Sequence, residues 1–366
     1  MSRAAPSAPP PAERIYVRLP NWVGDVVMAT PPLRALRRAY PRASITAGMR
    51  AYVAPVLRGF DAVDDVLLLD RGESRPFGGL ARHVRALRDR RFDAAFLFTN
   101  SFGTALGPAL ARIPTRAGYA GEGRRLLLTH AVPRRARKAP IPMPELYGRV
   151  LRAAGVPFEG GAYELPVLDD DRDEASRRLA RLGVDPTKPL IALVPGAKFG
   201  ASKLWAPERF AAAADALAAR FGAEVAILSG PGEGDIARRI VAAARSPVRT
   251  THDDVAPLGA LRGIVERCCL MLCNDTGPRF FAAALNKPLV CVMGSTHPGW
   301  SDWAMERQRV VRVDVPCGPC HLKTCPLDHA CMTGVRVDAV VRAAEDLAPS
   351  VASEAARVAA RFAGVR

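Results

Sequence analysis

Short apolar runs alternate with amphipathic segments along most of the 366-residue chain. Runs of this length bounded by turn residues predict buried strands, and a 3.6-residue apolar period predicts helices. In the first half the predicted strands are 15–19, 44–48, 66–69, 94–99 and 126–132. The predicted helices between and after them are 32–40, 79–90 and 145–154.

The second half repeats this alternation more regularly. Its predicted strands are 190–194, 224–229, 270–273, 289–293 and 310–313. Its predicted helices are 207–221, 235–244, 258–268 and 278–285. Strands that alternate with helices are typical of βαβ units, so each half is predicted to be a doubly wound α/β domain with a parallel sheet.

A polar stretch over 165–189 separates the two halves. Its three adjacent acids, Asp169, Asp170 and Asp171, precede a predicted helix at 174–182. Adjacent acids also occur at metal sites, but acids just before a helix are more simply caps that complement its dipole. The stretch therefore predicts a domain join that leads into a capped helix.

The domains that follow are 14–165 and 186–345, with a final helix within 346–366 that packs back across the join. Residues 1–13 are rich in Ala and Pro and lack the apolar centre of a secretion signal, so they predict a disordered tail. No run approaches the roughly 18 apolar residues that a membrane helix needs. The expected compartment is the cytoplasm.

Positive charge is concentrated in the first half. The chain has a net charge of +16, and residues 1–160 hold 26 Lys and Arg against 12 Asp and Glu. The remaining residues hold 26 against 24. A basic half indicates an anionic partner, with Arg124 and Arg125 expected on its surface, but no nucleic-acid-binding motif accompanies the charge. The alternative is the Arg-rich composition of a GC-rich genome.

Four polar loops follow predicted strands, and the carboxyl ends of parallel strands are where open α/β sheets bind ligands. They are the Gly24-Asp25 corner, PGAKFGASKLW at 195–205, GPGEGD at 230–235 and NDTGP at 274–278. The third loop resembles a dinucleotide fingerprint, but Asp235 stands where a small residue is needed and would repel a pyrophosphate. NAD is therefore not expected. Glu233 and Asp235 both remain as acceptors of ribose hydroxyl hydrogen bonds.

The second and fourth loops carry groups suited to a diphosphate. Asp275, Thr276 and Gly277 open a predicted helix, whose first amides hold phosphate oxygens. Lys203 supplies a cation. Each motif alone is also an ordinary capping or turn sequence, but all four loops stand in order at strand ends.

The stretches GDVVMATPPLRALRRAYP, PGAKFGASKLW, GPGE and NDTGPRFFAAALNKPLVCVMG together resemble glycosyltransferase family 9 over roughly residues 14–345. The resemblance is to lipopolysaccharide heptosyltransferases within that family. It implies a GT-B fold, with two Rossmann-like domains facing a central cleft. It also implies inverting, metal-independent transfer of heptose from ADP-L-glycero-D-manno-heptose to the lipopolysaccharide inner core.

The acceptor would be a lipid A–inner core at the cytoplasmic face of the inner membrane, bound by the N-terminal domain, with the enzyme peripheral to that membrane. No cofactor is expected for catalysis. Another nucleotide sugar or another glycan acceptor is the alternative within the family. A GT-B nucleotide-sugar epimerase would need further acid and base groups in the C-terminal domain, and the sequence offers no convincing set.

The resemblance also implies roles for particular residues. The family's general base corresponds to Asp25, for which a plain helix cap is the alternative. The implied donor-binding residues are Lys203, Glu233, Asp275, Thr276 and Gly277, with Asp235 as the alternative ribose contact. No acceptor-binding residue is assigned. The chain departs from the family pattern at Leu204, Ala206, Phe280 and His297, which puts donor or acceptor identity in doubt more than the reaction type.

The eight cysteines divide into two sets. Cys268, Cys269, Cys273 and Cys291 lie in or beside apolar strands and are expected to be buried. Cys317, Cys320, Cys325 and Cys331 form C-x2-C-x4-C-x5-C, interleaved with His321 and His329. In the cytoplasm such a cluster favours a structural metal over disulfides. A structural zinc ion and four reduced thiols remain the two alternatives, since the spacing is shorter than in usual zinc modules.

Overall fold

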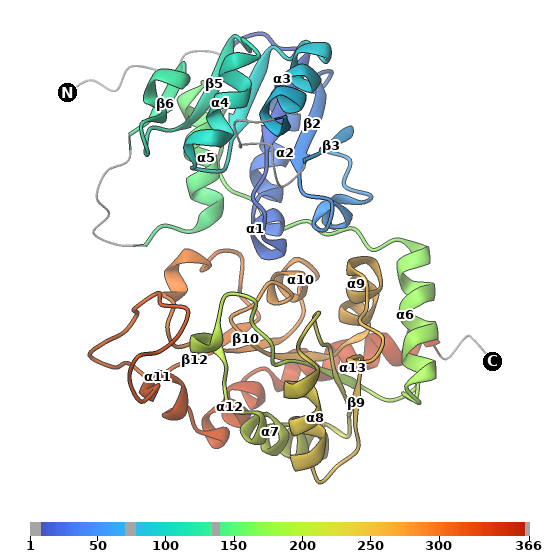
Figure 1. Cartoon of the computed structure of the whole chain (residues 1–366). Coiled ribbons are helices and arrows are strands. Elements are labelled where there is room, and N and C mark those ends of the chain that lie inside the picture. Colours follow the sequence, from blue (N-terminus) through green and yellow to red (C-terminus); the bar gives the residue numbers. More distant parts are fainter. Residues whose placement is uncertain (1–8, 70–77, 134–139, 363–366) are drawn as a thin grey trace. The chain divides into compact units, whose positions relative to one another are not determined.

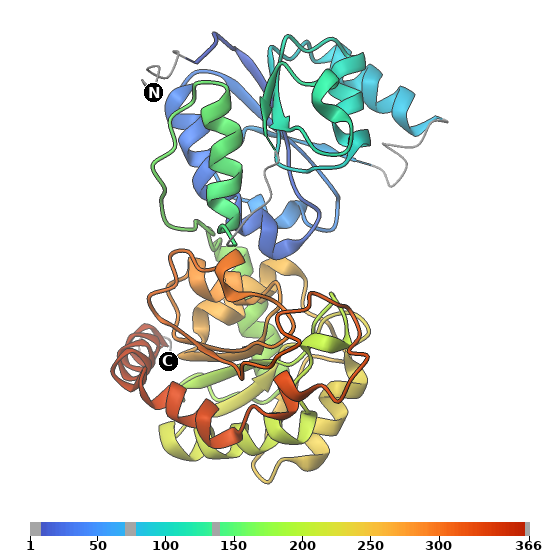
Figure 2. The same ribbon diagram turned by 90° about the vertical axis from the view of Figure 1, so that its left-hand side faces the viewer.

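A computed structural model of the chain describes residues 9–69, 78–133 and 140–362. The chain divides into a first unit, residues 1–166 with 299–303, and a second unit, residues 167–298 with 304–366. Each unit contains one six-stranded parallel sheet with helices against it (Figures 1 and 2). Of the predicted disordered tail, residues 1–8 lie outside the described residues, as do residues 363–366 of the predicted C-terminal segment.

The first unit has the strand order β3-β2-β1-β4-β5-β6. Its strands are β1 Arg14–Arg18, β2 Ser44–Met49, β3 Asp65–Leu68, β4 Ala94–Leu97, β5 Thr115–Tyr119 and β6 His130–Val132. Its helices are α1 Val23–Met28, α2 Thr30–Ala39, α3 Gly79–Asp89, α4 Phe102–Leu110 and α5 Met143–Ala153. The central strands β1 and β4 are almost wholly buried, as expected of parallel strands covered on both faces.

One strand of this unit was predicted wrongly. The predicted strand 126–132 is a 3-10 turn over Arg124–Leu127 followed by the short β6. Its neighbour β5, Thr115–Tyr119, was not predicted because its sequence TRAGY has no apolar run. The strand forms because β4 and β6 pair with it on either side.

The second unit has the strand order β12-β11-β10-β7-β8-β9. Its strands are β7 Leu190–Val194, β8 Glu224–Ile227, β9 Val248–Thr250, β10 Leu270–Asn274, β11 Leu289–Val292 and β12 Gln308–Val311. Its helices are α6 Asp169–Arg181, α7 Pro207–Phe221, α8 Gly234–Ala243, α9 Leu258–Arg267, α10 Arg279–Ala284, α11 Ala330–Thr333, α12 Val337–Glu345 and α13 Ala348–Phe362. In each unit the two halves of the sheet run outward from the first strand, which is the doubly wound arrangement. The predicted α/β class is therefore confirmed.

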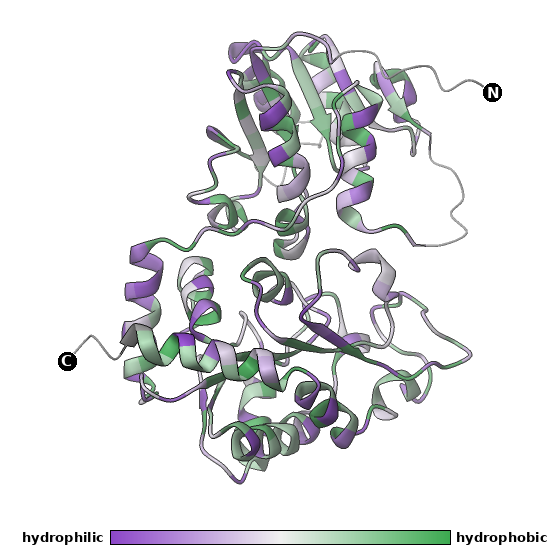
Figure 3. Ribbon diagram, turned by 180° about the vertical axis from the view of Figure 1, so that it is seen from behind, coloured by the Kyte–Doolittle hydropathy of each residue, from purple (hydrophilic) through white to green (hydrophobic). Residues whose placement is uncertain are grey.

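Helix α6 begins the second unit and carries mostly hydrophilic residues, as Figure 3 shows. It starts at Asp169 and not at 174, so the three acids lie in its first turn. Asp171 accepts the backbone N–H of Leu168 at 3.1 Å, which confirms a cap, and also pairs with buried Arg262 of α9 at 2.6 Å. The acid run therefore both caps α6 and fixes it to α9.

Helix α13 packs on the second unit. Val351 belongs to its hydrophobic core, and Glu354 pairs with buried Lys287 at 2.8 Å and with Arg307 at 2.9 Å. Packing of this helix across the join stays a prediction. Within the part of the chain that the structure describes, every helix is too short or too polar to cross a membrane.

Candidate functional site

The second unit brings two of the predicted loops to one point of its sheet. Strand order reverses between β7 and β10, which are hydrogen-bonded neighbours. The loop 195–205 follows β7, and Asp275 follows β10 directly. In doubly wound sheets ligands bind at such a reversal, at the carboxyl ends of the strands.

Asp275 is the centre of this region. Its carboxylate accepts hydrogen bonds from Lys203 Nζ at 2.5 Å, Arg279 at 2.5 Å and Thr296 Oγ1 at 2.6 Å. Burial opposes the charge, but the Arg279 and Lys203 cations and these hydrogen bonds hold the Asp275 pKa well below its usual range. The structure thus brings together the predicted residues Lys203 and Asp275 as a partly buried ion pair with an extra cation.

Arg279 and Thr296 were not identified from the sequence. Arg279 is the fourth residue after Asp275, and the turn that leads into α10 brings the two side chains together. Its side chain is 1% exposed. Thr296 comes from the loop after β11, and only the tertiary fold places it on Asp275.

The side chain of Asn274 connects the two loops by hydrogen bonds. Its side-chain amide donates to the carbonyl of Pro195 at 2.5 Å, and its oxygen accepts the N–H of Trp205 at 3.2 Å. Asn274 is completely buried, so these bonds have no competition from water. The Lys203 loop is therefore fixed at both ends to the residue preceding Asp275.

Thr276 and Gly277 do not open a helix as predicted. They lie in a turn, and α10 begins only at Arg279. Their carbonyls accept the N–H groups of Arg279 and Phe280 at 3.3 and 3.1 Å. The helix has six residues. Contacts between the Thr276 and Gly277 amides and a diphosphate stay a prediction.

In the loop after β8 the two candidate ribose contacts, Glu233 and Asp235, point in different directions. Glu233 turns inward, where its carboxylate accepts the N–H of Gly230 at 2.7 Å, and burial raises its pKa. A Cβ added to Gly196 would lie 1.9 Å from the Glu233 Cδ, so only glycine there lets the carboxylate lie against the loop that carries Lys203. Asp235 instead is 90% exposed and pairs with Arg238.

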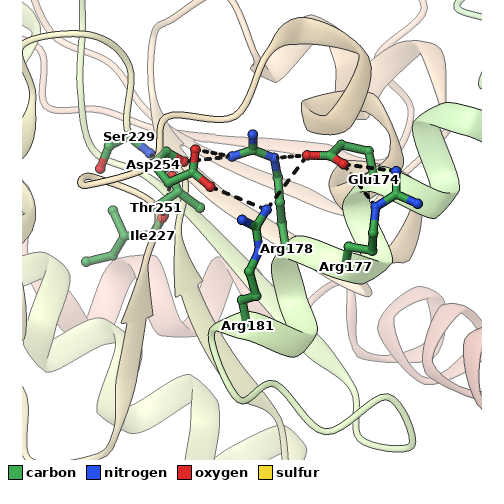
Figure 4. A network of polar contacts seen from close by, with 8 residues as sticks. All are labelled: Glu174, Arg177, Arg178, Arg181, Ile227, Ser229, Thr251 and Asp254. Atoms are coloured by element: carbon green, nitrogen blue, oxygen red, sulfur yellow. Dashed lines mark hydrogen bonds and ion pairs between the residues drawn. The ribbon is translucent and has the colours of Figure 1, made fainter.

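Figure 4 shows how α6 supports the start of this loop. Arg178 and Arg181 of α6 pair with Asp254 at 2.8 and 3.4 Å, and the N–H of Asp254 donates to the Thr251 carbonyl at 3.2 Å. The Thr251 hydroxyl oxygen accepts the N–H of Ser229 at 3.1 Å. A chain of polar contacts therefore runs from α6 to the residue before Gly230.

In the first unit, Asp25 lies at the corresponding reversal of strand order, after β1 and in the first turn of α1. The loop before it is fixed by Arg18, whose guanidinium donates to Asn21 Oδ1 at 3.2 Å, and by Tyr52, which bonds the Asn21 carbonyl. Asp25 is half-buried. Its charge adds to the effect of burial in raising the pKa of Tyr147, so the two groups lie within electrostatic range.

One of the two arginines predicted to lie on the surface of the first unit is buried instead. Arg124 is completely buried and donates to the Thr99 carbonyl at 2.6 Å, and burial lowers its pKa to about 10. It is therefore a structural residue of the 3-10 turn, and the expectation of exposure was wrong. Arg125 is exposed as predicted.

The two cysteine sets are both present as free thiols. Cys268, Cys269, Cys273 and Cys291 are buried as predicted. Among the described residues, no three or more His, Cys, Asp or Glu side chains are assembled as a metal site. Burial raises the pKa of the Cys331 thiol, and Cys325, Cys320 and Cys317 lie within electrostatic range of it. A four-thiol set suits zinc chemically, and a structural zinc ion and four reduced thiols remain the two alternatives.

Known proteins resemble this chain in fold and in sequence. A model of glycosyltransferase family 9 (heptosyltransferase) matches residues 80–331. Lipopolysaccharide heptosyltransferase 2 of Salmonella typhimurium is 29% identical over 308 residues, which cover 82% of this chain and 88% of that protein. Lipopolysaccharide heptosyltransferase 3 of Escherichia coli is 25% identical over 292 residues, covering 77% and 84%. The structure of E. coli ADP-heptose lps heptosyltransferase II has a TM-score of 0.74 at 26% identity, over 93% of this chain and 99% of that one, which confirms the predicted GT-B fold.

Proposed function

The chain belongs to glycosyltransferase family 9, and from this premise we propose that it transfers heptose from ADP-L-glycero-D-manno-heptose to the lipopolysaccharide inner core. The observation that carries the proposal is the Lys203–Asp275–Thr296 cluster at the strand-order reversal of the second unit. The named relatives, one of them an ADP-heptose enzyme, support the choice of sugar and acceptor.

The charge of this cluster suits a nucleoside diphosphate sugar. Two cations, Lys203 and Arg279, meet one carboxylate, Asp275, which leaves one positive charge beside the loops. We assign Lys203 to the donor diphosphate, since a flexible ammonium can hold Asp275 and a phosphate oxygen together. Arg279 keeps Asp275 ionised, so its carboxylate can accept hydrogen bonds from sugar hydroxyls.

Nucleoside recognition falls to Glu233 in this proposal. Its carboxylate lies beside Gly196 and Gly230, in the loops that follow β7 and β8, whereas Asp235 points to solvent. A carboxylate there accepts hydrogen bonds from ribose hydroxyls. The proposal also retains the Thr276 and Gly277 amides as diphosphate contacts.

Asp25 is assigned as the general base. The acceptor hydroxyl gives its proton to the Asp25 carboxylate as the hydroxyl oxygen bonds to the anomeric carbon. The bond between that carbon and the diphosphate oxygen breaks, and its electron pair leaves with ADP. Attack from the face opposite ADP inverts the anomeric centre. The residues named supply both proton transfer and charge stabilisation, so the proposed step requires no metal and no cofactor.

The acceptor in this proposal is a lipid A–inner core, which presents its sugars at the cytoplasmic face of the inner membrane. The enzyme would act from the cytoplasm and lie peripherally on that membrane. The excess of positive charge in residues 1–160 suits the carboxylates and phosphates of such an acceptor.

The test is a panel of nucleotide sugars and acceptor lipids, with products identified by mass spectrometry. We expect heptosylated inner core from ADP-heptose and no comparable product from UDP- or GDP-sugars. Transfer from another nucleotide sugar, or to another glycan, would favour the family alternative. Absence of glycosyl transfer across the panel, with wild-type protein that binds ADP, would contradict the proposal.

A further inference from the structure

The residue beside Lys203 is fixed by a distant part of the chain. We call residues 317–331 the cysteine segment. Ser202, 1% exposed, donates its N–H to the Lys323 carbonyl at 3.0 Å and its hydroxyl to the Leu322 carbonyl. A Cβ added to Gly200 would lie 2.3 Å from the Lys323 oxygen, so the two backbones approach as closely as glycine permits.

His329 completes this attachment. Its Nε2 lies 2.8 Å from the Ser202 carbonyl oxygen. A carbonyl only accepts, so the proton must be on Nε2 and the histidine is the donor. His329 itself has a positive φ of 60°, the left-handed conformation, and lies directly before α11, the helix that contains Cys331. Both backbone polar groups of Ser202 are thus bonded to the cysteine segment.

The cysteine segment also holds the loop that presents Thr296. The N–H of His321 donates to the Ser295 carbonyl at 2.8 Å, and the Ser295 hydroxyl lies 3.1 Å from that of Ser202. A Cβ on Gly294 would lie 2.8 Å from the Cys331 sulfur. The cysteine segment therefore contacts the residues that precede Lys203 and Thr296 in the chain. Lys203 and Thr296 are two of the three side chains that are hydrogen-bonded to Asp275.

We propose that the cysteine segment is a positioning element of the donor site, and that His329 is the positioning residue that sets the place of Lys203 through the Ser202 carbonyl. In this arrangement His329 contacts neither donor nor acceptor. The inference rests on the proposed function only where Lys203 is said to contact the donor diphosphate. A purely structural segment would stabilise the fold without setting the reactivity of one lysine.

Lysine labelling tests the positioning without any substrate. A short pulse of an amine-reactive acetylating reagent, read by mass spectrometry, gives the labelling rate of Lys203 against exposed Lys188 in the same molecule. Lys203 is 13% exposed and paired, so it should label slowly in the wild type. In His329→Ala the loss of one hydrogen bond should raise the relative rate roughly fivefold.

His329→Gln retains a side-chain donor and should restore most of the protection. Leu327→Ala is the matched control, since Leu327 lies two residues away and is 64% exposed. If His329→Ala does not fold, Ser202→Ala removes only the hydroxyl bonds and should also speed the labelling of Lys203. An unchanged Lys203 rate in a folded His329→Ala or Ser202→Ala variant would overturn the proposal.

A second measurement asks whether His329 acts through Lys203. His329→Ala should raise the KM for ADP-heptose roughly fivefold and leave kcat nearly unchanged. Lys203→Ala with His329→Ala should be no worse than Lys203→Ala alone, because the two act on one contact. If the two substitutions raised the donor KM additively, His329 would not act through Lys203 and the proposal would be overturned. If the wild type transfers no heptose but the labelling result holds, the proposed function fails and the positioning role stands.

Discussion

Asp275→Asn should cost far more stability than the same change at Asp235. Both aspartates pair with an arginine three or four residues later, but Asp275 is 13% exposed and Asp235 is 90% exposed. The Asn at 275 keeps the shape of the side chain and removes the negative charge that pairs with both Lys203 and Arg279. Breaking a buried ion pair by removing one partner costs about 3–5 kcal/mol, whereas an exposed pair contributes about 0–1 kcal/mol.

The difference should depend on pH in a defined direction. The folded pKa of Asp275 lies below its unfolded value, so its stabilisation is fully present above that value, about pH 4. It is lost as pH falls through the lower folded pKa. The wild type and Asp275→Asn should therefore differ most near neutral pH and approach each other below about pH 4.

Urea unfolding of the two variants and the wild type measures both effects, followed by a probe in the second unit such as Trp205 fluorescence. Trp205 is 1% exposed and its N–H bonds Asn274, next to the site. Equal losses for Asp275→Asn and Asp235→Asn, or a difference that grows on acidification, would refute the account of Asp275 as a buried anion between two cations.

Three further predictions concern the other loops and the surface. Gly196→Ala should displace the Glu233 carboxylate and raise the KM for donor. Gly234→Ala should not, because its Cβ would meet the end of the flexible Arg238 side chain at 3.2 Å and would lie at an ordinary contact distance of 3.6 Å from His252. Equal donor KM values for the two variants would remove Glu233 from the site. Elemental analysis separates the two alternatives for the four cysteines. Bound zinc should appear at about one equivalent per chain, with Cys317→Ser lowering the melting temperature, whereas a zinc-free protein of full stability would leave four reduced thiols. Because the Debye length is roughly 10 Å at 0.1 M salt, added salt should raise the acceptor KM more steeply than the donor KM, and replacing exposed Arg42 and Arg125 with Gln should flatten that slope. Equal slopes for the two substrates would make the basic half a compositional bias.

The elements predicted well are those whose sequence pattern and tertiary environment agree. Strand β7 and helix α7 were predicted at their observed bounds. The short apolar run of β7 is typical of a buried strand, and the 3.6-residue apolar period of α7 is typical of a helix. β5 and β9 were missed because TRAGY and VRT are short and polar, and only their paired neighbours make them strands. The start of α6 was missed because the acids were placed before the helix that contains them.

The candidate site shows the same division. Strand ends can be located from the sequence, so Lys203, Glu233 and Asp275 could be predicted as neighbours of one region. The sequence could not show which of Glu233 and Asp235 turns inward, because the direction of the backbone in one loop decides it. Nor could the sequence show the contact of His329 with Ser202, since 127 residues separate them and no local pattern relates the two.

The rate of heptose transfer by Asp25→Asn tests the central claim most directly. The amide preserves the shape of the side chain but cannot take the acceptor proton, so single-turnover transfer from ADP-heptose should fall about 10²–10⁴-fold. Stability and ADP affinity should match those of the wild type. Asp61→Asn, at an aspartate of the same unit that is 80% exposed, serves as the control and should transfer normally. Near-normal transfer by folded Asp25→Asn would contradict the account, because the proposed base would then be dispensable.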